Sequence, residues 1–143
     1  MKIRGHGIKQ VLVLRTDASM PAGKLCAQAS HASLGAFLSR EQVSFTPLPD
    51  GRVKLEAIIS AFAAEWFKEL SVKVALAVPD EVKLHAIYDQ AKAAGLPCVL
   101  IQDAGFTHFD GVPTYTAVGI GPAPAQDIDP ITGHLPLLKN ATA

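Results

Sequence analysis

Three polar residues and a glycine near the start of the chain have the spacing of one helix face. Lys24, Gln28, His31 and Gly35 are separated by four, three and four positions, so a helix would place them in one row. A cation, an amide and an imidazole near the first turn of a helix suit an anionic or ester-bearing ligand. The alternative is the polar outer face of a surface helix that binds no ligand. Spacing alone leaves both interpretations open.

Asp103 is a second candidate for chemistry, in a segment that also contains Thr107. As a catalytic group, its carboxylate would orient a water molecule or a neighbouring hydroxyl such as that of Thr107. The sequence Asp-Ala-Gly is also a common turn, in which the aspartate accepts a hydrogen bond from its own backbone. Both interpretations place Asp103 in a loop after a strand.

Other familiar catalytic and metal-binding patterns do not occur in the sequence. The segment Ala22-Gly23-Lys24 lacks the leading glycine of a phosphate-binding loop, and there is no G-x-S-x-G motif. The five histidines lack the spacing of metal ligands, so we expect no metal and no cofactor. Cys26 and Cys98 lie far apart with no C-x-x-C pair, and we expect both to be reduced and buried.

The elements that must position these groups alternate along the chain. The predicted strands are residues 10–14, 72–78, 98–101 and 115–120, and the predicted helices are residues 24–39, 55–70 and 79–94. This order predicts a three-layer α/β/α domain with a four-stranded mixed, mostly parallel sheet. No helical pattern precedes the last strand, so we expect it to run antiparallel at one side. Ligands of such sheets bind beyond the carboxyl ends of the strands, where residues 16–24 and 102–108 fall.

Two segments lie outside this alternation. Residues 39–55 contain Pro47, Pro49 and an Asp50-Gly51 turn signal, which predict an insertion or extended loop with a small hairpin. Residues 121–138 are predicted as a turn-rich closing segment. Neither segment has the composition of a linker, so we interpret residues 1–143 as a single domain.

Composition excludes several classes of protein. The chain is 49% hydrophobic and 18% charged, which excludes wholesale disorder. Its longest apolar run, Val74 to Val78, is far too short for a transmembrane helix, and no secretory signal fits the N-terminus, so we expect a cytoplasmic protein. The net charge is zero, but residues 1–40 carry +5 and the remainder −5, which permits an anionic partner near the first helix.

Seven short motifs, in order along the chain, resemble one protein family. They are KQVLVLRTD at residues 9–17, MPAGKLCAQASHA at 20–32, KVALAVP at 73–79, GLP at 95–97, IQDAG at 101–105, GIGPAP at 119–124 and IDPITGHL at 128–135. Together they resemble the type 2, archaeal and eukaryotic-type, peptidyl-tRNA hydrolases. The resemblance covers nearly the whole chain except residues 39–65.

The resemblance implies a cytosolic, metal-independent esterase with an α/β fold, commonly a homodimer. Its substrate would be the acceptor end of peptidyl-tRNA, and cleavage of the ester between the peptide and the 3′-terminal ribose would recycle tRNA. The family's proposed active-site residues fall on Lys24, Gln28, His31, Asp103 and Thr107. These are the same side chains that spacing and position had already selected.

We therefore predict two groups of site residues. The predicted catalytic residues are Lys24, His31, Asp103 and Thr107, and the predicted substrate-binding residues are Gln28, Asp17, Arg15, Phe106 and His108. Asp103 and Thr107 would position water, and Lys24 would stabilise the oxyanion or the terminal phosphate. Gln28 and His31 would orient the substrate.

The sequence departs from the family pattern at three positions. The family usually has a second lysine at the position of Ala22, an arginine at Phe106 and a glutamine at His108. Fewer cations weaken binding to phosphates, whereas Phe106 could stack on a terminal adenine or simply pack. Residues 39–55 are also longer than the segment that usually connects the first helix to the tryptophan region in this family. The alternatives are a catalytically weak or inactive RNA-binding protein, or a hydrolase of another small ester or amide.

Overall fold

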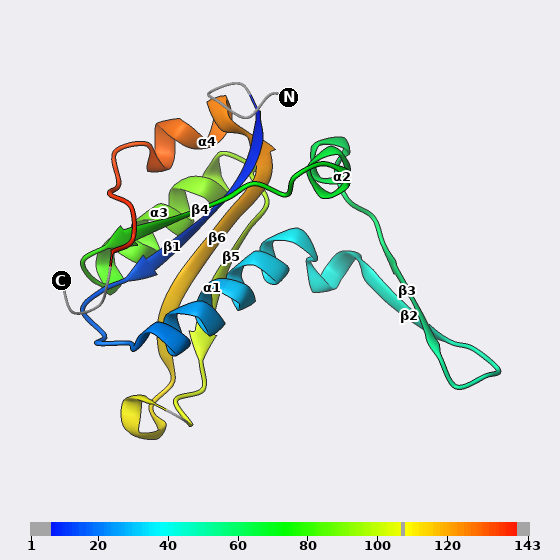
Figure 1. Cartoon of the computed structure of the whole chain (residues 1–143), viewed down its shortest axis with the longest axis horizontal. Helices are drawn as coiled ribbons and strands as arrows, with labels where there is room; N and C mark the ends of the chain where they lie inside the picture. Colours follow the sequence, from blue (N-terminus) through cyan, green and yellow to red (C-terminus); the bar gives the residue numbers. More distant parts are fainter. Residues whose placement is uncertain (1–6, 107, 140–143) are drawn as a thin grey trace.

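The computed structural model describes residues 7–106 and 108–139, and Figure 1 shows how they fold. The strands are β1 (Ile8–Arg15), β2 (Val43–Pro47), β3 (Val53–Ala57), β4 (Lys73–Val78), β5 (Cys98–Asp103) and β6 (Thr114–Pro124). The helices are α1 (Ala22–Phe37), α2 (Ala61–Lys68), α3 (Glu81–Ala93) and α4 (Ala125–Thr132), with short 3₁₀ turns at Arg40–Gln42 and Phe109–Gly111.

Four strands form one mixed sheet in the order β4-β1-β6-β5. β1 and β4 are parallel, whereas β6 is antiparallel to both β1 and β5. Three strands therefore point the same way, which confirms the predicted α/β class and mixed sheet, although only one adjacent pair is parallel. The antiparallel strand was expected at one side of the sheet, and this is wrong. Because no helix separates β5 from β6, the chain turns back directly and β6 fills the centre.

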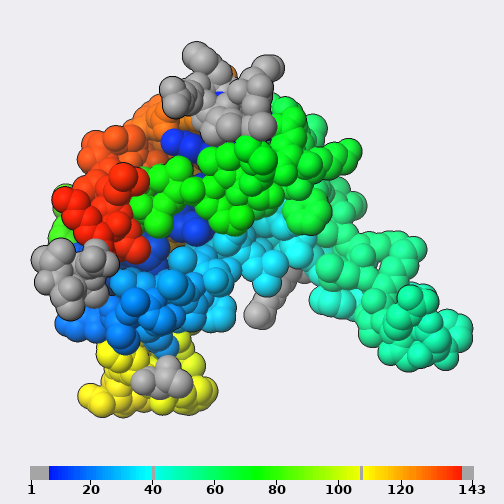
Figure 2. Space-filling view, in the orientation of Figure 1, coloured from blue at the N-terminus to red at the C-terminus, as the bar shows by residue number. Residues whose placement is uncertain are grey.

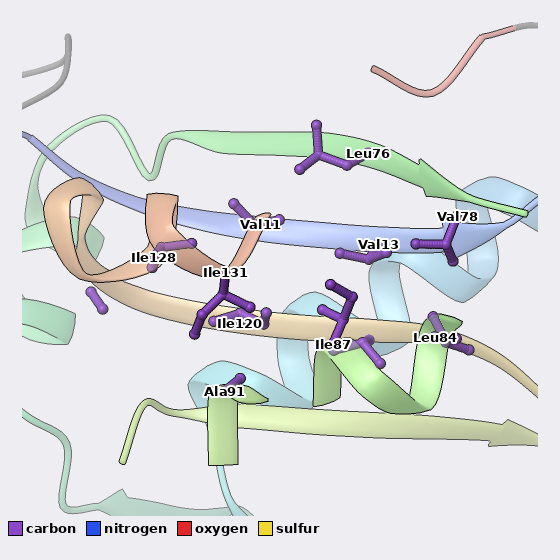
Figure 3. Close-up of a cluster of buried hydrophobic side chains, with 12 residues drawn as sticks. Val11, Val13, Leu76, Val78, Leu84, Ile87, Ala91, Ile120, Ile128 and Ile131 are labelled. Atoms are coloured by element: carbon purple, nitrogen blue, oxygen red, sulfur yellow. The ribbon is translucent and has the colours of Figure 1, made fainter. Parts of the chain in front are cut away.

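Helices cover both faces of this sheet, as predicted for three layers (Figure 1). Successive side chains of β1 point to opposite faces, so Val11 and Val13 join one core while Leu12 and Leu14 join the other. Figure 3 shows the first core, to which α3 and α4 contribute Leu84, Ile87, Ala91, Ile128 and Ile131. The second core lies under α1.

Two glycines allow α1 to lie close to the sheet. A Cβ on Gly119 of β6 would lie 2.3 Å from the carbonyl oxygen of Ala32, and a Cβ on Gly35 would lie 3.2 Å from the Val99 side chain. The buried Gln10 side chain of β1 also holds this helix, because its Nε2 donates to the Ser33 carbonyl oxygen over 3.0 Å. These contacts fix α1 so that its first two turns reach the end of β5.

The predicted hairpin is present, but it is longer than the sequence indicated. β2 and β3 pair with each other and not with the main sheet. Residues 55–57 were predicted to begin a helix, and they instead form the end of β3. The second helix starts only at Ala61, where the Ser60 hydroxyl caps it by accepting from the Ala63 backbone N–H over 3.0 Å. Alternating polar and apolar residues at 53–57 determine the strand, since this period suits a pleated ribbon.

The closing segment contains a helix that the sequence analysis missed. Residues 121–138 were predicted as a turn-rich closing segment, yet residues 125–132 form α4 with Pro130 inside it. Ile128 and Ile131, three positions apart, are both buried against the first core. The burial of these two side chains offsets the hydrogen bond that Pro130 cannot donate.

The two outer edges of the sheet differ. Beyond β4, the C-terminal segment adds backbone hydrogen bonds: the Ala77 N–H donates to Pro136 and the Leu138 N–H donates to Ala75, each over 3.0 Å. Beyond β5, no backbone pairing occurs within residues 7–106 and 108–139. β5 therefore presents a row of backbone groups that a further strand can use.

The cysteines correct another prediction. Cys26 is exposed and Cys98 is only half-buried, so the expectation that both are buried is wrong. Position 26 lies about a quarter-turn from the alanine stripe that α1 buries, and its side chain therefore points outward. Burial raises the pKa of the Cys98 thiol. Within the described part of the chain, no helix has the length and apolar character needed to cross a membrane.

Candidate active site

Asp103, at the end of β5, accepts hydrogen bonds from two different segments. Lys24 and Gln28 of α1 donate to its Oδ1 from Nζ and Nε2 over 3.0 and 3.2 Å. The backbone N–H of Gly105 donates to its Oδ2 over 2.9 Å. The predicted helix face and the predicted loop after β5 therefore meet at one carboxylate.

The surroundings of Asp103 keep it ionised. Burial raises the pKa of the carboxyl, but the hydrogen bonds from Lys24, Gly105 and Gln28, together with the lysine charge, outweigh burial and bring the pKa below its ordinary value of 3.8. A carboxylate whose pKa lies below its ordinary value is a poor acceptor of a whole proton at neutral pH. It has four lone-pair positions, so it can still accept a hydrogen bond from a water or hydroxyl and orient it.

Gln28 is the most buried member of this cluster, with only 1% of its surface exposed. Its side-chain oxygen accepts a hydrogen bond from the hydroxyl of Thr116, while its nitrogen donates to Asp103. Thr116 thereby fixes which end of the amide faces the carboxylate. The alternative that this helix face is simply a polar outer surface does not hold for Gln28.

Thr116 reaches Gln28 because of a β-bulge in β6. Ile101 pairs with Ala117 and Gln102 pairs with Tyr115, so Thr116 is the extra residue between them. Regular alternation would turn Thr116 away from Ala117, but the bulge lets both residues face α1. Sequence reasoning missed Thr116. The available signal was a hydroxyl residue in a strand whose next four residues are small or apolar.

Both interpretations of the Asp-Ala-Gly sequence, as a turn and as part of a site, apply to Asp103. Asp103 does make the expected turn bond to its own backbone, and it also receives the long-range donors of α1. Gly105 has a φ of 85°, and a Cβ there would lie 2.5 Å from the carbonyl oxygen of Val112. Only glycine fits this position, where the chain turns so that Gly105 lies against Val112 beside the site.

The remaining predicted residues lie around this cluster. His31 is exposed and lines a groove that also contains Asp103. Phe106 is 91% exposed, so it contributes little to packing. His108 Nε2 lies 3.4 Å from the carbonyl oxygen of Ala18 and thus connects the loop after β5 to the loop after β1. Thr107 lies outside the described residues.

Arg15 and Asp17 form a separate pair at the end of β1. Arg15 Nε and Nη2 donate to the two Asp17 oxygens over 2.8 and 3.0 Å, and Nη1 donates to the Tyr115 carbonyl oxygen. The hydrogen bond from Arg15 lowers the pKa of the Asp17 carboxyl. Among the described contacts, none joins this pair to Lys24 or Asp103. The structure therefore brings together Lys24, Gln28 and Asp103, and it places Arg15 and Asp17 in a separate pair.

The geometry can support hydrolysis of an ester. An anion that orients water and a cation beside it are the groups that such a reaction needs, since negative charge develops on the carbonyl oxygen. Within residues 7–106 and 108–139, no cluster of three or more histidine, cysteine or carboxylate side chains has the arrangement of a metal site. The described side chains supply positioning and charge.

Comparison with known proteins agrees with this chemistry. Residues 8–138 match the family described as peptidyl-tRNA hydrolase PTH2. The chain belongs to this family. A peptidyl-tRNA hydrolase of Methanopyrus kandleri is 41% identical over 131 residues, covering 92% of this chain and 98% of the relative. One from Methanocaldococcus jannaschii is 40% identical over 131 residues, covering 92% and 100%.

A similar solved structure supports the fold, but not the function. A protein of unknown function from Agrobacterium tumefaciens superimposes with a TM-score of 0.53 over 92% of this chain and 97% of that one. Its sequence identity is 14%, so the likeness concerns the arrangement of elements and not the chemistry. Membership of the hydrolase family, which the motifs at residues 9–17 and 20–32 had indicated, is confirmed by the sequence matches.

Proposed function

We propose that this protein hydrolyses the ester between a peptide, or an N-blocked aminoacyl group, and the 3′-terminal ribose of tRNA. The observation that carries the proposal is the convergence of Lys24 and Gln28 on the Asp103 carboxylate at the carboxyl end of β5. Family membership narrows the ester to that of peptidyl-tRNA. The α1 helix supplies the cation and the amide, and β5 supplies the anion.

The catalytic roles follow from charge and geometry. Asp103 accepts a hydrogen bond from the attacking water and aligns it with the ester carbonyl. Lys24, 3.0 Å from Asp103, stabilises the negative charge that develops on the carbonyl oxygen or holds the terminal phosphate. Gln28, locked by Thr116, keeps the carboxylate in place. His31 and Thr107 complete the proposed set, and His31 lines the groove that contains Asp103.

The RNA side of the substrate is proposed to lie over the loops after β1 and β5. Exposed Phe106 offers a ring on which the terminal adenine can stack. His108 connects the two loops, and the Arg15–Asp17 pair lies at the base of the first loop. Stacking of the adenine on Phe106 would replace part of the tRNA binding that the family's usual arginine provides at this position.

The deciding experiment is release of the acetylated amino acid from N-acetyl-aminoacyl-tRNA by the purified protein, beside the Asp103→Ala variant. We expect turnover by the wild type and loss of it in the variant. Binding of tRNA without turnover by the wild type would instead favour an RNA-binding protein. Absence of both turnover and binding would favour a different ester or amide as substrate.

We also propose that the protein acts as a homodimer in the cytoplasm, where peptidyl-tRNA arises. Support for the dimer comes from apolar side chains exposed on α2, among them Phe62 and Phe67. Sedimentation equilibrium tests this: the wild type should have the mass of two chains, and Phe67→Asp should shift it toward one. A wild-type mass of one chain would contradict the proposed dimer.

A further inference from the structure

A large groove leads away from Asp103 along the outer edge of the sheet. Its volume is about 1080 Å³, with His31 and Asp103 at one end and the β2–β3 hairpin at the other. Most of the lining is apolar and includes Leu34, Leu38, Phe45, Leu55, Val99 and Ile101, with Ser39 and Gln102 as further polar members. Three separate elements, α1, β5 and the hairpin, contribute to it.

The hairpin has one apolar face and one polar face. Phe45 pairs with Leu55 across the two strands, whereas Ser44 pairs with Glu56 on the opposite face. Phe45 is 70% exposed and Leu55 is 50% exposed, although both line the groove. Figure 2 shows the hairpin standing clear of the body of the protein. A two-stranded hairpin with its apolar face in water is weakly stable, so an occupant that covers this face would stabilise it.

The floor of the groove is continuous with the candidate active site. Val99, Ile101 and Asp103 are alternate residues of β5, so their side chains lie in a row on the face toward α1. The outer backbone edge of β5 makes no pairing in the part of the chain that the structure describes. An extended chain can therefore add to β5 by backbone hydrogen bonds while its side chains contact the apolar walls.

We propose that this groove binds the peptide part of the substrate and favours peptides with apolar side chains. The inference rests on the proposed function, because the ester to be cut must lie at Asp103 and the peptide must leave from there. At roughly 3.3 Å per residue, the six residues of β5 accommodate about five residues of extended peptide. An apolar wall suits peptide side chains, whereas RNA phosphates require cations such as Lys24.

Phe45 and Leu55 are then determinants of specificity and take no part in the chemical step. They belong to the hairpin and lie at the opposite end of the groove from Asp103. Their loss should raise KM for long apolar substrates and leave kcat unchanged. A substrate with one amino acid does not reach them, so its KM should not respond.

The test uses three tRNA substrates with the same last residue: N-acetyl-Leu, N-acetyl-Leu-Val-Phe-Leu and N-acetyl-Ser-Gly-Ser-Leu. For the wild type we expect KM to be about tenfold lower for the apolar peptide than for the other two, the scale of burying one large apolar side chain. The Phe45→Ser/Leu55→Ser variant should lose this difference. The matched control, Ser44→Ala/Glu56→Ala, changes the opposite cross-strand pair and should keep it.

A second wall gives an independent variant. Leu34 lies on α1, is well exposed and lines the groove, so Leu34→Gln should fold and should also reduce the preference for the apolar peptide. Circular dichroism and thermal melting check that every variant is folded. Equal KM values for all three substrates in the wild type would overturn the peptide groove while leaving the hydrolase intact.

Two further outcomes separate the inference from its premises. If the wild type cleaves none of the three substrates, the proposed function fails first. If Phe45→Ser/Leu55→Ser changes the sedimentation mass and not the preference for the apolar peptide, a second copy of the chain covers the hairpin face. Either result would overturn the assignment of the groove to the peptide.

Discussion

Two carboxylates lie at the ends of parallel-pointing strands, Asp17 after β1 and Asp103 at the end of β5, and each pairs with a cation. Asp17 pairs with Arg15, two residues away, in a bidentate contact. Asp103 pairs with Lys24, seventy-nine residues away. The Asp17 side chain is 41% exposed and that of Asp103 is 15% exposed. The two ion pairs thus differ in two respects. Arg15–Asp17 joins neighbouring residues and is more exposed, whereas Lys24–Asp103 joins distant residues and is more buried.

The difference shows what each pair depends on. Both members of the Arg15–Asp17 pair come from one short segment at the end of β1, and one further hydrogen bond ties Arg15 to the Tyr115 carbonyl oxygen of β6. The Lys24–Asp103 pair exists only when α1 lies against β5 and β6, a position that Gly119 and Gly35 permit. The charge of the second pair is therefore held in a fixed, partly dry place, where charges act more strongly on a reacting group.

The largest expected difference between the pairs is catalytic. Lys24→Met or Asp103→Asn should lower kcat by about a hundredfold or more, the scale of losing one transition-state contact. Asp17→Asn should lower kcat/KM by less than about tenfold, since exposed pairs contribute little. Steady-state hydrolysis of N-acetyl-aminoacyl-tRNA measures both. Equal losses of kcat/KM in Asp17→Asn and Asp103→Asn would contradict the prediction that only the Lys24–Asp103 pair is catalytic.

Displacing α1 should disturb one pair and leave the other. Gly119→Ala places a Cβ 2.3 Å from the Ala32 carbonyl oxygen, so α1 must shift, at a cost of about 1–3 kcal/mol. We expect a lower melting temperature and reduced kcat. Gly23→Ala is the matched control, because a Cβ there meets nothing within 4 Å, and it should preserve both. Unchanged melting of Gly119→Ala would contradict the close approach of helix and sheet.

A smaller effect is expected from the hydroxyl behind Gln28. Thr116→Val keeps the shape but removes the donor to the buried Gln28 oxygen, which should cost about 1–3 kcal/mol of stability. A more mobile amide should lower kcat by about tenfold or less. Thr116→Ser retains the hydroxyl and should behave like the wild type. If the serine and valine variants behave alike, the hydrogen bond has no role in the site.

The smallest predicted effect is on the pH dependence of stability. The pKa of Asp103 is lowered in the folded state, so its contribution is present above the ordinary value of 3.8 and is lost as the pH falls. Asp103→Asn should therefore show a weaker decline in unfolding free energy than the wild type from about pH 5 downward. Asp17→Asn should differ less, because its pair is more exposed. Urea denaturation at several pH values measures the slopes, and a decline in Asp103→Asn as steep as in the wild type would contradict the prediction.

The elements built from local patterns were predictable from the sequence. Four consecutive apolar residues, Val11 to Leu14, identified a strand buried on both faces, and i, i+4, i+7 spacing put Lys24 and Gln28 on one helix face. Topology alone selected residues 102–108, and Asp103 of this segment meets the helix face. Its placement in a loop was wrong, because β5 extends through Asp103. The site was thus visible as two separate segments.

Features that depend on tertiary contacts were not predictable. The bulge that directs Thr116 toward Gln28 arises from the pairing of β5 with β6, and no local pattern encodes it. The burial of Ile128 and Ile131 makes α4 possible despite Pro130. The predicted start of the second helix, at residue 55, was wrong because two patterns overlap there. The polar–apolar alternation of β3 continues to Ala57, while apolar residues at helical spacing already begin. For Thr116 and for α4, packing outweighed local propensity.

The hydrogen bonds that the C-terminal segment makes to Ala75 and Ala77 limit how copies of this protein can associate. A sheet that grows by adding strands from other copies needs two open edges, one to give and one to receive. Among residues 7–106 and 108–139, the four-stranded sheet leaves only the β5 edge open, because the C-terminal segment occupies the edge of β4. Edge-to-edge pairing of the four-stranded sheet must therefore stop at two molecules and cannot continue into a fibre.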